Sequence, residues 1–187
     1  MNRLDFEGRT AVITGGGAGI GLAIAQRLVE SGGRVSLWDR DAGALERARA
    51  IPAAAFELAD YAGREARDAA MATWLEGRGV RLVVLAGYMH ILTPTFLDRF
   101  PDAVVNVHPS LLPAFPGAHA VEEQLAAGVV ESGATVHIVD EGVDSGPILA
   151  QERVAVLPGD TAETLHERIK SVEHRLLPEV VRELCAR

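Results

Sequence analysis

Cysteine is almost absent from this chain, and the class of disulfide-stabilised proteins is excluded with it. The single cysteine, Cys185, has no intrachain partner, which favours a reducing compartment such as the cytoplasm. Long apolar runs are missing too, since none approaches the roughly 20 residues that cross a membrane as a helix. The first residues do not form a basic segment followed by an apolar one, so a secreted protein is not expected.

Positive charge is also in short supply. The chain has 18 Lys and Arg against 26 Asp and Glu, which gives a net charge of −8 at pH 7. A negative field repels nucleic acids and anionic membranes, so neither is expected as the main partner. We expect small-molecule substrates, no metal ion, and a monomer or a homodimer.

What is present is a regular alternation of elements. With 187 residues, 48% of them hydrophobic, the chain fits one domain, residues 1–187. Apolar patterning predicts strands at 9–14, 34–38, 53–56, 82–86, 103–107, 134–139 (half-exposed) and 148–154, and helices at 20–31, 42–50, 64–76, 93–100, 120–127 and 161–185. This order is typical of an α/β fold, a three-layer, doubly wound, mostly parallel sheet of the Rossmann-like type.

A glycine cluster follows the first strand and opens the first helix. Bare backbone N–H groups at such a turn can cradle a phosphate, and an acidic residue after the next strand, here Asp39, can accept ribose hydroxyls. The motif resembles the NAD-binding opening of short-chain dehydrogenases, which implies weak NAD binding; alternatively, the glycines only close the corner between strand and helix. The cluster consists of Gly15, Gly16, Gly17, Gly19 and Gly21.

Hydride transfer is not expected, because the dehydrogenase family also needs a Tyr-x-x-x-Lys pair. Tyr61 is followed four positions on by Glu65, and Tyr88 by Leu92. Neither can supply the lysine that lowers the pKa of the tyrosine.

Two later motifs together supply an amide, an imidazole and a carboxylate. Asn106 and His108 end a buried strand two residues apart, so both side chains project to one side. Donors at this place can stabilise the negative oxygen of an acyl-transfer transition state. Asp144, on a glycine-flanked loop, would orient His108 and assist proton transfer. The three residues are therefore the predicted catalytic set.

Three motifs carry a resemblance to a known family. They are Val-Val-Leu-Ala-Gly-Tyr-Met-His-Ile-Leu from 83, Asn-Val-His-Pro-Ser-Leu-Leu-Pro from 106 and Asp-Ser-Gly-Pro from 144. Over about residues 42–186 the chain resembles the glycinamide ribonucleotide formyltransferases of purine biosynthesis. The resemblance implies transfer of a formyl group from 10-formyltetrahydrofolate to the primary amine of glycinamide ribonucleotide. It also implies folate contacts from Met89, His90, Ile91, Leu92, Val139, Asp140 and Glu141, and ribonucleotide contacts from Lys170 and Glu173. On residues alone, the 83–92 segment could equally be a core strand with a loop, and Lys170 and Glu173 a solvated helix face.

The N-terminus departs from that family, which carries a Gly-Asn-Gly-Ser-Asn type loop for the ribonucleotide phosphate where this chain has its glycine cluster. We therefore interpret the chain as a hybrid of a dehydrogenase-like unit, residues 1–41, and a formyltransferase-like unit, residues 42–187. An engineered chimera is the hypothesis, and natural recombination the alternative. The alternative function is a fold chimera without useful turnover that retains affinity for NAD or another nucleotide. His137 and His166 receive no role.

Overall fold

The computed structural model describes residues 10–39, 41–48, 53–55 and 62–186 of the chain, which forms two compact units. The first unit comprises Met1–Val105 with Cys185–Arg187, and the second comprises Asn106–Leu184. Strand β5 (Val104–His108) begins in the first unit and ends in the second. Tyr61 and the outer ends of the elements predicted at 9–14, 42–50 and 53–56 lie outside the described residues.

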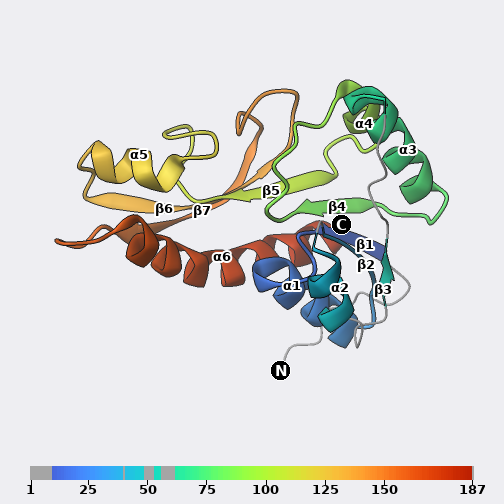
Figure 1. Ribbon diagram of the computed structural model, residues 1–187, viewed down its shortest axis with the longest axis horizontal. Coiled ribbons are helices and arrows are strands. Elements are labelled where there is room, and N and C mark those ends of the chain that lie inside the picture. The colour runs from blue at the N-terminus through green and yellow to red at the C-terminus, as the bar shows by residue number, and fades with distance from the viewer. Residues whose placement is uncertain (1–9, 40, 49–52, 56–61, 187) are drawn as a thin grey trace. The chain divides into compact units, whose positions relative to one another are not determined.

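The first unit is an α/β layer structure. Its strands follow the order β3-β2-β1-β4-β5, and β1 pairs in parallel with both β2 and β4. Helices α1 and α2 lie on one side of these strands, and α3 and α4 lie on the other (Figure 1). The bounds are β1 Thr10–Thr14, α1 Gly19–Glu30, β2 Arg34–Trp38, α2 Ala42–Arg47, β3 Ala53–Ala55, α3 Arg64–Glu76, β4 Leu82–Leu85 and α4 Pro94–Leu97.

Apolar runs explain the buried strands of this unit. Ile13 on β1 and Val84 on β4 are fully buried, as expected for strands covered on both faces, which contain continuous rather than alternating apolar residues. Met71 and Leu75 are also buried and lie four residues apart on α3. This spacing places both on one helix face, which therefore packs inward.

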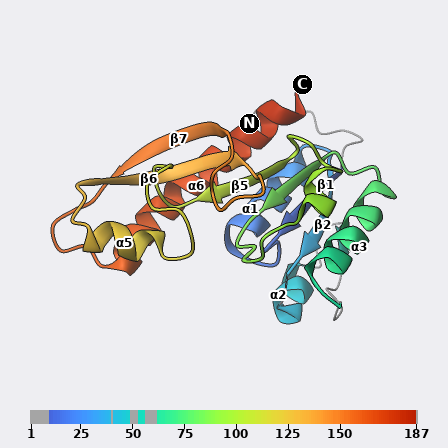
Figure 2. The ribbon, with the colours of Figure 1, turned by 90° about the horizontal axis from the view of Figure 1, so that it is seen from above.

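The second unit contains the end of β5 with β6 (Glu131–Ile138) and β7 (Ile148–Ala155), in the order β5-β6-β7. β6 and β7 are antiparallel, and their register shifts between Val136 and His137. Within this unit, α5 (Ala120–Ala126) lies on one side of the strands and α6 (Ala162–Cys185) on the other (Figures 1 and 2). The α/β class with a mostly parallel sheet and helices on both sides is therefore confirmed.

One prediction about a strand was wrong. We expected residues 134–139 to be half-exposed, but β6 is buried from Ser132 to Ile138. The alternation in its sequence has another cause. The polar members, Thr135 and His137, form hydrogen bonds inside the protein rather than with solvent.

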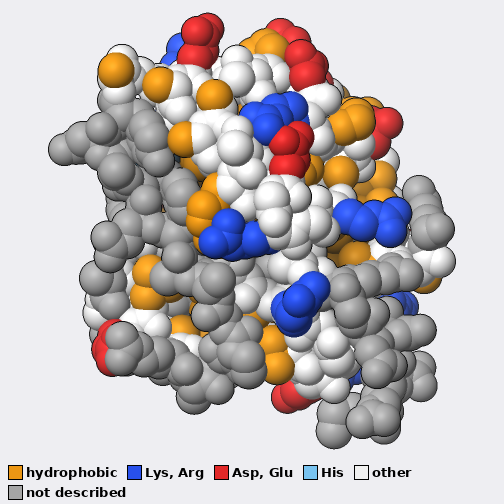
Figure 3. All heavy atoms as spheres, turned by 90° about the vertical axis from the view of Figure 1, so that its right-hand side faces the viewer, with side chains coloured by type: hydrophobic (Ala, Val, Ile, Leu, Met, Phe, Trp, Pro, Cys, Tyr) orange, Lys and Arg blue, Asp and Glu red, His pale blue; other side chains and the backbone are white. Residues whose placement is uncertain are grey.

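The remaining elements fall close to their predicted positions. The helix predicted at 93–100 is shorter in the structure, where α4 covers only Pro94–Leu97. Among the described residues on the face seen in Figure 3, basic side chains are interspersed with acidic and apolar ones and form no continuous stripe. Among the described residues, no helix is both long and apolar enough to span a membrane.

Candidate active site

The predicted catalytic set comes together in the second unit. His108, at the end of β5, is buried, and its Nδ1 lies 3.2 Å from Oδ2 of Asp144. Asn106 is half-buried on the same strand, and its Nδ2 lies 3.4 Å from Nε2 of His137. His137 in turn contacts Asp144. An amide, two imidazoles and a carboxylate therefore form one connected cluster.

The His108 ring lies between two acceptors. Nδ1 faces the Asp144 carboxylate at 3.2 Å, and Nε2 lies 2.7 Å from the carbonyl oxygen of Phe115. A neutral imidazole can donate from only one nitrogen, whereas an imidazolium donates from both. Each ring nitrogen of His108 therefore has an acceptor oxygen within hydrogen-bonding distance.

Asp144 is the centre of the cluster. Its Oδ2 accepts the backbone N–H of Gly117 at 2.8 Å as well as facing His108, and its Oδ1 lies 3.4 Å from Nε2 of His137. Burial by itself raises the pKa of Asp144, but the hydrogen bonds from His137 and Gly117 and the charge of the two imidazoles outweigh it, so that the pKa lies below its ordinary value. Asp144 is therefore held as a carboxylate.

His137, to which the sequence analysis gave no role, belongs to this cluster. Its side chain is only 2% exposed, and its Nδ1 lies 2.8 Å from the carbonyl oxygen of Ile138. That contact directs Nε2 toward both Asn106 and Asp144. The sequence carries no local signal for this role, because the alternating strand predicted at 134–139 fits a half-exposed position, in which a histidine would face solvent.

The loop from Pro109 to Gly117 is fastened to the strands beside it. Thr135 on β6 donates to the Ser110 carbonyl at 2.6 Å and accepts the Leu112 N–H at 3.1 Å. Gln151 on β7 donates to the Leu112 carbonyl at 2.7 Å. These anchors, which the sequence analysis did not foresee, fix the backbone that presents the Phe115 carbonyl to His108.

Two partners of His108 have unusual backbone conformations. Phe115 has φ 56° and Asp144 has φ 52°, both in the left-handed region. Residues other than glycine rarely adopt it, and such conformations concentrate at functional sites. The contacts around His108 therefore depend on backbone shapes that the rest of the unit must hold in place.

The glycine cluster follows β1 in the first unit. Gly15 has φ +62°, and a Cβ there would overlap the carbonyl oxygen of Ala86, while one on Gly21 would overlap that of Gly15. The close approach of backbone to backbone thus accounts for these two glycines without a ligand. Asp39, the predicted ribose contact, accepts the N–H of Gly17 at 3.1 Å, so its carboxylate faces the loop.

The predicted folate residues fall in both units. In the first, Met89 is 67% and Ile91 47% exposed on the irregular segment after β4, whereas Leu92 is buried. His90 packs edge-on against Tyr88, with 5.6 Å between ring centroids. The other three follow β6 in the second unit, Val139 and Asp140 half-buried and Glu141 exposed. That the two groups form one folate pocket stays a prediction.

The predicted ribonucleotide contacts on α6 differ from each other. Lys170 pairs with Glu167 one turn earlier at 2.5 Å. Glu173 is only 3% exposed, and burial raises its pKa to about 7 against the lowering effect of Lys170. A solvated helix face is therefore the wrong interpretation for Glu173, which is a buried, easily protonated carboxyl.

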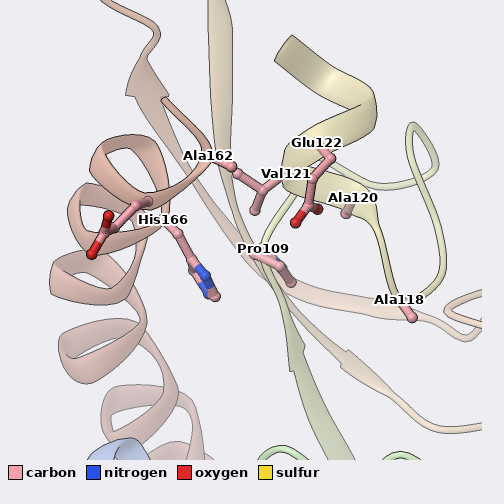
Figure 4. Close-up of a pocket in the computed structure, with 8 residues that line it drawn as sticks. Pro109, Ala118, Ala120, Val121, Glu122, Ala162 and His166 are labelled. Atoms are coloured by element: carbon pink, nitrogen blue, oxygen red, sulfur yellow. The ribbon is translucent and has the colours of Figure 1, made fainter. Parts of the chain in front are cut away.

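A cavity of about 330 Å³ opens within the second unit next to Pro109, the residue that follows His108. It is lined by Pro109, by α5 residues and by the start of α6, and Figure 4 shows Glu122 and His166 directed into it. Burial lowers the pKa of His166, and Lys170 lowers it further against Glu167 and Glu122. The cavity thus borders the loop that follows His108, and Asn106, His108 and Asp144 are not among the residues that line it. Among the described residues, no group of His, Cys, Asp and Glu is arranged to hold a metal ion.

The fold and the cluster define a class, α/β proteins with an amide, imidazole and carboxylate arranged for acyl transfer at the end of a strand. The comparison with protein families narrows this class. Residues 24–181 match the family described as "Formyl transferase", and the chain belongs to that family.

Individual relatives agree. A protein named phosphoribosylglycinamide formyltransferase in Mycobacterium tuberculosis is 51% identical over 149 residues, covering 79% of this chain and 69% of the relative. One of the same name in Bacillus subtilis is 41% identical over 174 residues, covering 87% of each. The crystal structure of glycinamide ribonucleotide transformylase 1 from Symbiobacterium toebii superposes with a TM-score of 0.84 at 44% identity, covering 93% of this chain and 85% of that one.

Proposed function

We propose that this protein transfers a formyl group from 10-formyltetrahydrofolate to the primary amine of glycinamide ribonucleotide. Relatives that are 41–51% identical carry the name of that activity, and the matched region includes most of the length of each relative. The observation that carries the proposal within the chain is the cluster of Asn106, His108 and Asp144, in which His137 joins Asn106 to Asp144. The protein is a formyltransferase of purine biosynthesis.

The cluster suits the bonds that must change. The amine nitrogen attacks the formyl carbon, a tetrahedral intermediate forms with negative charge on the formyl oxygen, and the bond from that carbon to N10 of the folate then breaks. One proton leaves the attacking amine and one reaches N10. Asn106 and His108 would donate to the negative oxygen, each contributing about 3 kcal/mol to the transition state. For this, the substrate oxygen would have to take the place of the Phe115 carbonyl oxygen, which lies 2.7 Å from Nε2 of His108.

Asp144 and His137 complete the proposed machinery. Asp144 would keep His108 in orientation and stabilise its positive charge while the proton moves, directly or through a water molecule. His137 lies between Asp144 and the Asn106 amide. It would therefore hold that amide in the plane from which it can donate.

A transfer assay with both substrates tests the function. We expect formylated glycinamide ribonucleotide to form with the parent protein, and His108→Ala to reduce kcat by roughly 100-fold or more, because it removes an oxyanion donor and the proton-handling group together. Arg153→Ala, which breaks an exposed ion pair with Glu131 on the same unit, is the control and should keep the parent rate. A parent protein without transfer activity would contradict the proposal, and a His108→Ala variant at full rate would make His108 structural.

We further propose that residues 1–41 derive from a short-chain dehydrogenase-type unit, joined to the formyltransferase segment by engineering or recombination. The proposal is motivated by the glycine cluster, residues 15–21, which precedes the family match; that match begins at residue 24 and therefore already includes the later part of this unit. The loop offers N–H groups at the start of α1, a suitable place for a phosphate. Because Asp39 already accepts the Gly17 N–H, NAD would have to displace that bond, and its affinity should be weak.

A further inference from the structure

The segment between β4 and α4, residues 88–93, lacks regular secondary structure and is tied to α3 at three points. We call it the donor segment, because it contains four of the residues expected to contact folate. It carries two exposed apolar side chains, Met89 and Ile91. An irregular segment that exposes apolar groups would ordinarily be mobile. Here its backbone is anchored from behind.

Arg67 and Asp68 of α3 make two of these ties. Asp68 is fully buried, and its Oδ2 accepts the backbone N–H of Thr93 at 2.7 Å. Its Oδ1 accepts Nε–H of Arg67 at 2.7 Å. The same guanidinium donates through Nη2 to the carbonyl oxygen of Ile91 at 3.2 Å. The Arg67–Asp68 ion pair thus holds two backbone groups of the donor segment, the carbonyl of Ile91 and the N–H of Thr93.

The third tie is at Tyr88. The Arg67 guanidinium lies 6.0 Å from the centre of the Tyr88 ring, and the Tyr88 hydroxyl lies 3.9 Å from the sulfur of Met71, also on α3. Burial raises the pKa of Tyr88 to about 12; Arg67 opposes and Asp68 adds to this effect. The first, fourth and last residues of the donor segment are therefore fixed on the helix, while Met89, His90 and the Ile91 side chain stay outward.

We propose that Arg67 and Asp68 are positioning residues for the formyl donor, which hold the donor segment in the shape that receives the pterin ring. This inference rests on the proposed function. A pterin would be recognised by main-chain groups with apolar side chains around them, and such groups bind well only if they are already in place. The ion pair supplies that order without touching the ligand.

Kinetics with both substrates distinguish this role from general stability. In Arg67→Met, which keeps the apolar stem and removes the guanidinium, we expect the KM for 10-formyltetrahydrofolate to rise roughly tenfold, with kcat changed less than about threefold and the KM for glycinamide ribonucleotide unchanged. Arg67→Lys should recover part of the loss, since it restores the charge without the forked geometry. Asp68→Asn should resemble Arg67→Met. A parent-like donor KM in Arg67→Met, or equal rises in both KM values, would overturn the proposal.

Arg99→Ala is the matched control. Arg99 also ties α3 to a later segment, through Glu76 and the Ala69 carbonyl, but it does not reach the donor segment. Its variant should keep the donor KM within about twofold. Similar rises in the Arg67 and Arg99 variants would show that α3 stability alone matters.

Hydrogen exchange of the ligand-free protein separates this inference from the proposed function. We expect faster amide exchange at residues 88–93 in Arg67→Met than in the parent, with the amides of α3 unchanged. Unchanged exchange at 88–93 would overturn the positioning role even in an active enzyme. Failure of the parent to bind folate in a calorimetric titration would instead remove the proposed function, and the donor assignment with it.

Discussion

At the scale of single residues, the site depends on the Asp144 carboxylate, whose two oxygens contact different partners. Oδ2 of Asp144 serves His108 and the Gly117 amide, and Oδ1 faces His137. The sequence predicted the contact with His108, because the motifs around His108 and Asp144 together supply an imidazole and a carboxylate that would orient it. It did not predict His137, because a histidine on an alternating strand fits an exposed position equally well, and only the tertiary packing decides between them.

Glu173 is the residue whose ionisation should be visible in stability. Its pKa of about 7 lies above the ordinary value of 4.5. The protonated folded form is therefore favoured, so the stability that Glu173 contributes is fully present below about pH 4.5 and is lost as the pH rises through 7. Glu173→Gln should remove this loss. We expect the unfolding free energy of Glu173→Gln, relative to that of the parent, to increase by up to about 3 kcal/mol as the pH rises from 4.5 to 8.

Urea unfolding at a series of pH values checks this prediction. Glu183→Gln, at an exposed carboxyl on the same helix, is the control and should follow the parent curve. If the parent and Glu173→Gln curves stay parallel over this range, then Glu173 is ionised in the folded protein and its burial is matched by an unseen partner.

At the scale of elements, the glycine cluster shows how one motif can have two physical reasons. Gly15 and Gly19 both have positive φ, but only Gly15 has a neighbour in the way, the Ala86 carbonyl. Gly15→Ala should therefore lose about 3 kcal/mol, from the left-handed backbone and the overlap together, and Gly19→Ala only about 1 kcal/mol from the backbone. Thermal unfolding of the two variants measures the difference. Equal losses would mean that the β4 end can move away from the loop.

The positions of most elements could be predicted, because buried parallel strands and amphipathic helices leave strong apolar patterns. The α3 prediction, residues 64–76, agrees with the structure at both ends. The helix predicted at 93–100 was too long, since its apolar residues Phe96 and Phe100 also fit a short helix followed by a turn. Loop anchors such as Thr135 and Gln151 could not be predicted, because each hydrogen bond joins distant parts of the chain.

At the scale of the whole molecule, the N-terminal glycine loop should affect the binding of one ligand more than that of the others. The residues expected to bind folate lie outside residues 1–41, whereas the ribonucleotide phosphate would meet the glycine cluster, which lacks the serine and asparagine side chains of the family's loop. Losing one or two hydrogen bonds to a phosphate costs about 1.5–3 kcal/mol each, a weakening of roughly tenfold to over a hundredfold.

Parallel calorimetric titrations with glycinamide ribonucleotide, folate and NAD check this. Relative to the Bacillus subtilis protein, we expect weakened ribonucleotide binding, comparable folate binding and weak but saturable NAD binding. A ribonucleotide affinity equal to that of the Bacillus subtilis protein would contradict the prediction that this loop governs phosphate recognition. Absence of NAD binding would leave the glycines with only their part in closing the corner.

The left-handed backbone conformation of Phe115 has a consequence for which substitutions the site can accept during evolution. Its contribution to His108 comes from a main-chain carbonyl, which every amino acid possesses. The identity of residue 115 can therefore change while its backbone conformation must not, and glycine, asparagine or aspartate would adopt that conformation most readily. The contact with His108 can thus be preserved through the backbone conformation at residue 115 while the side chain there varies.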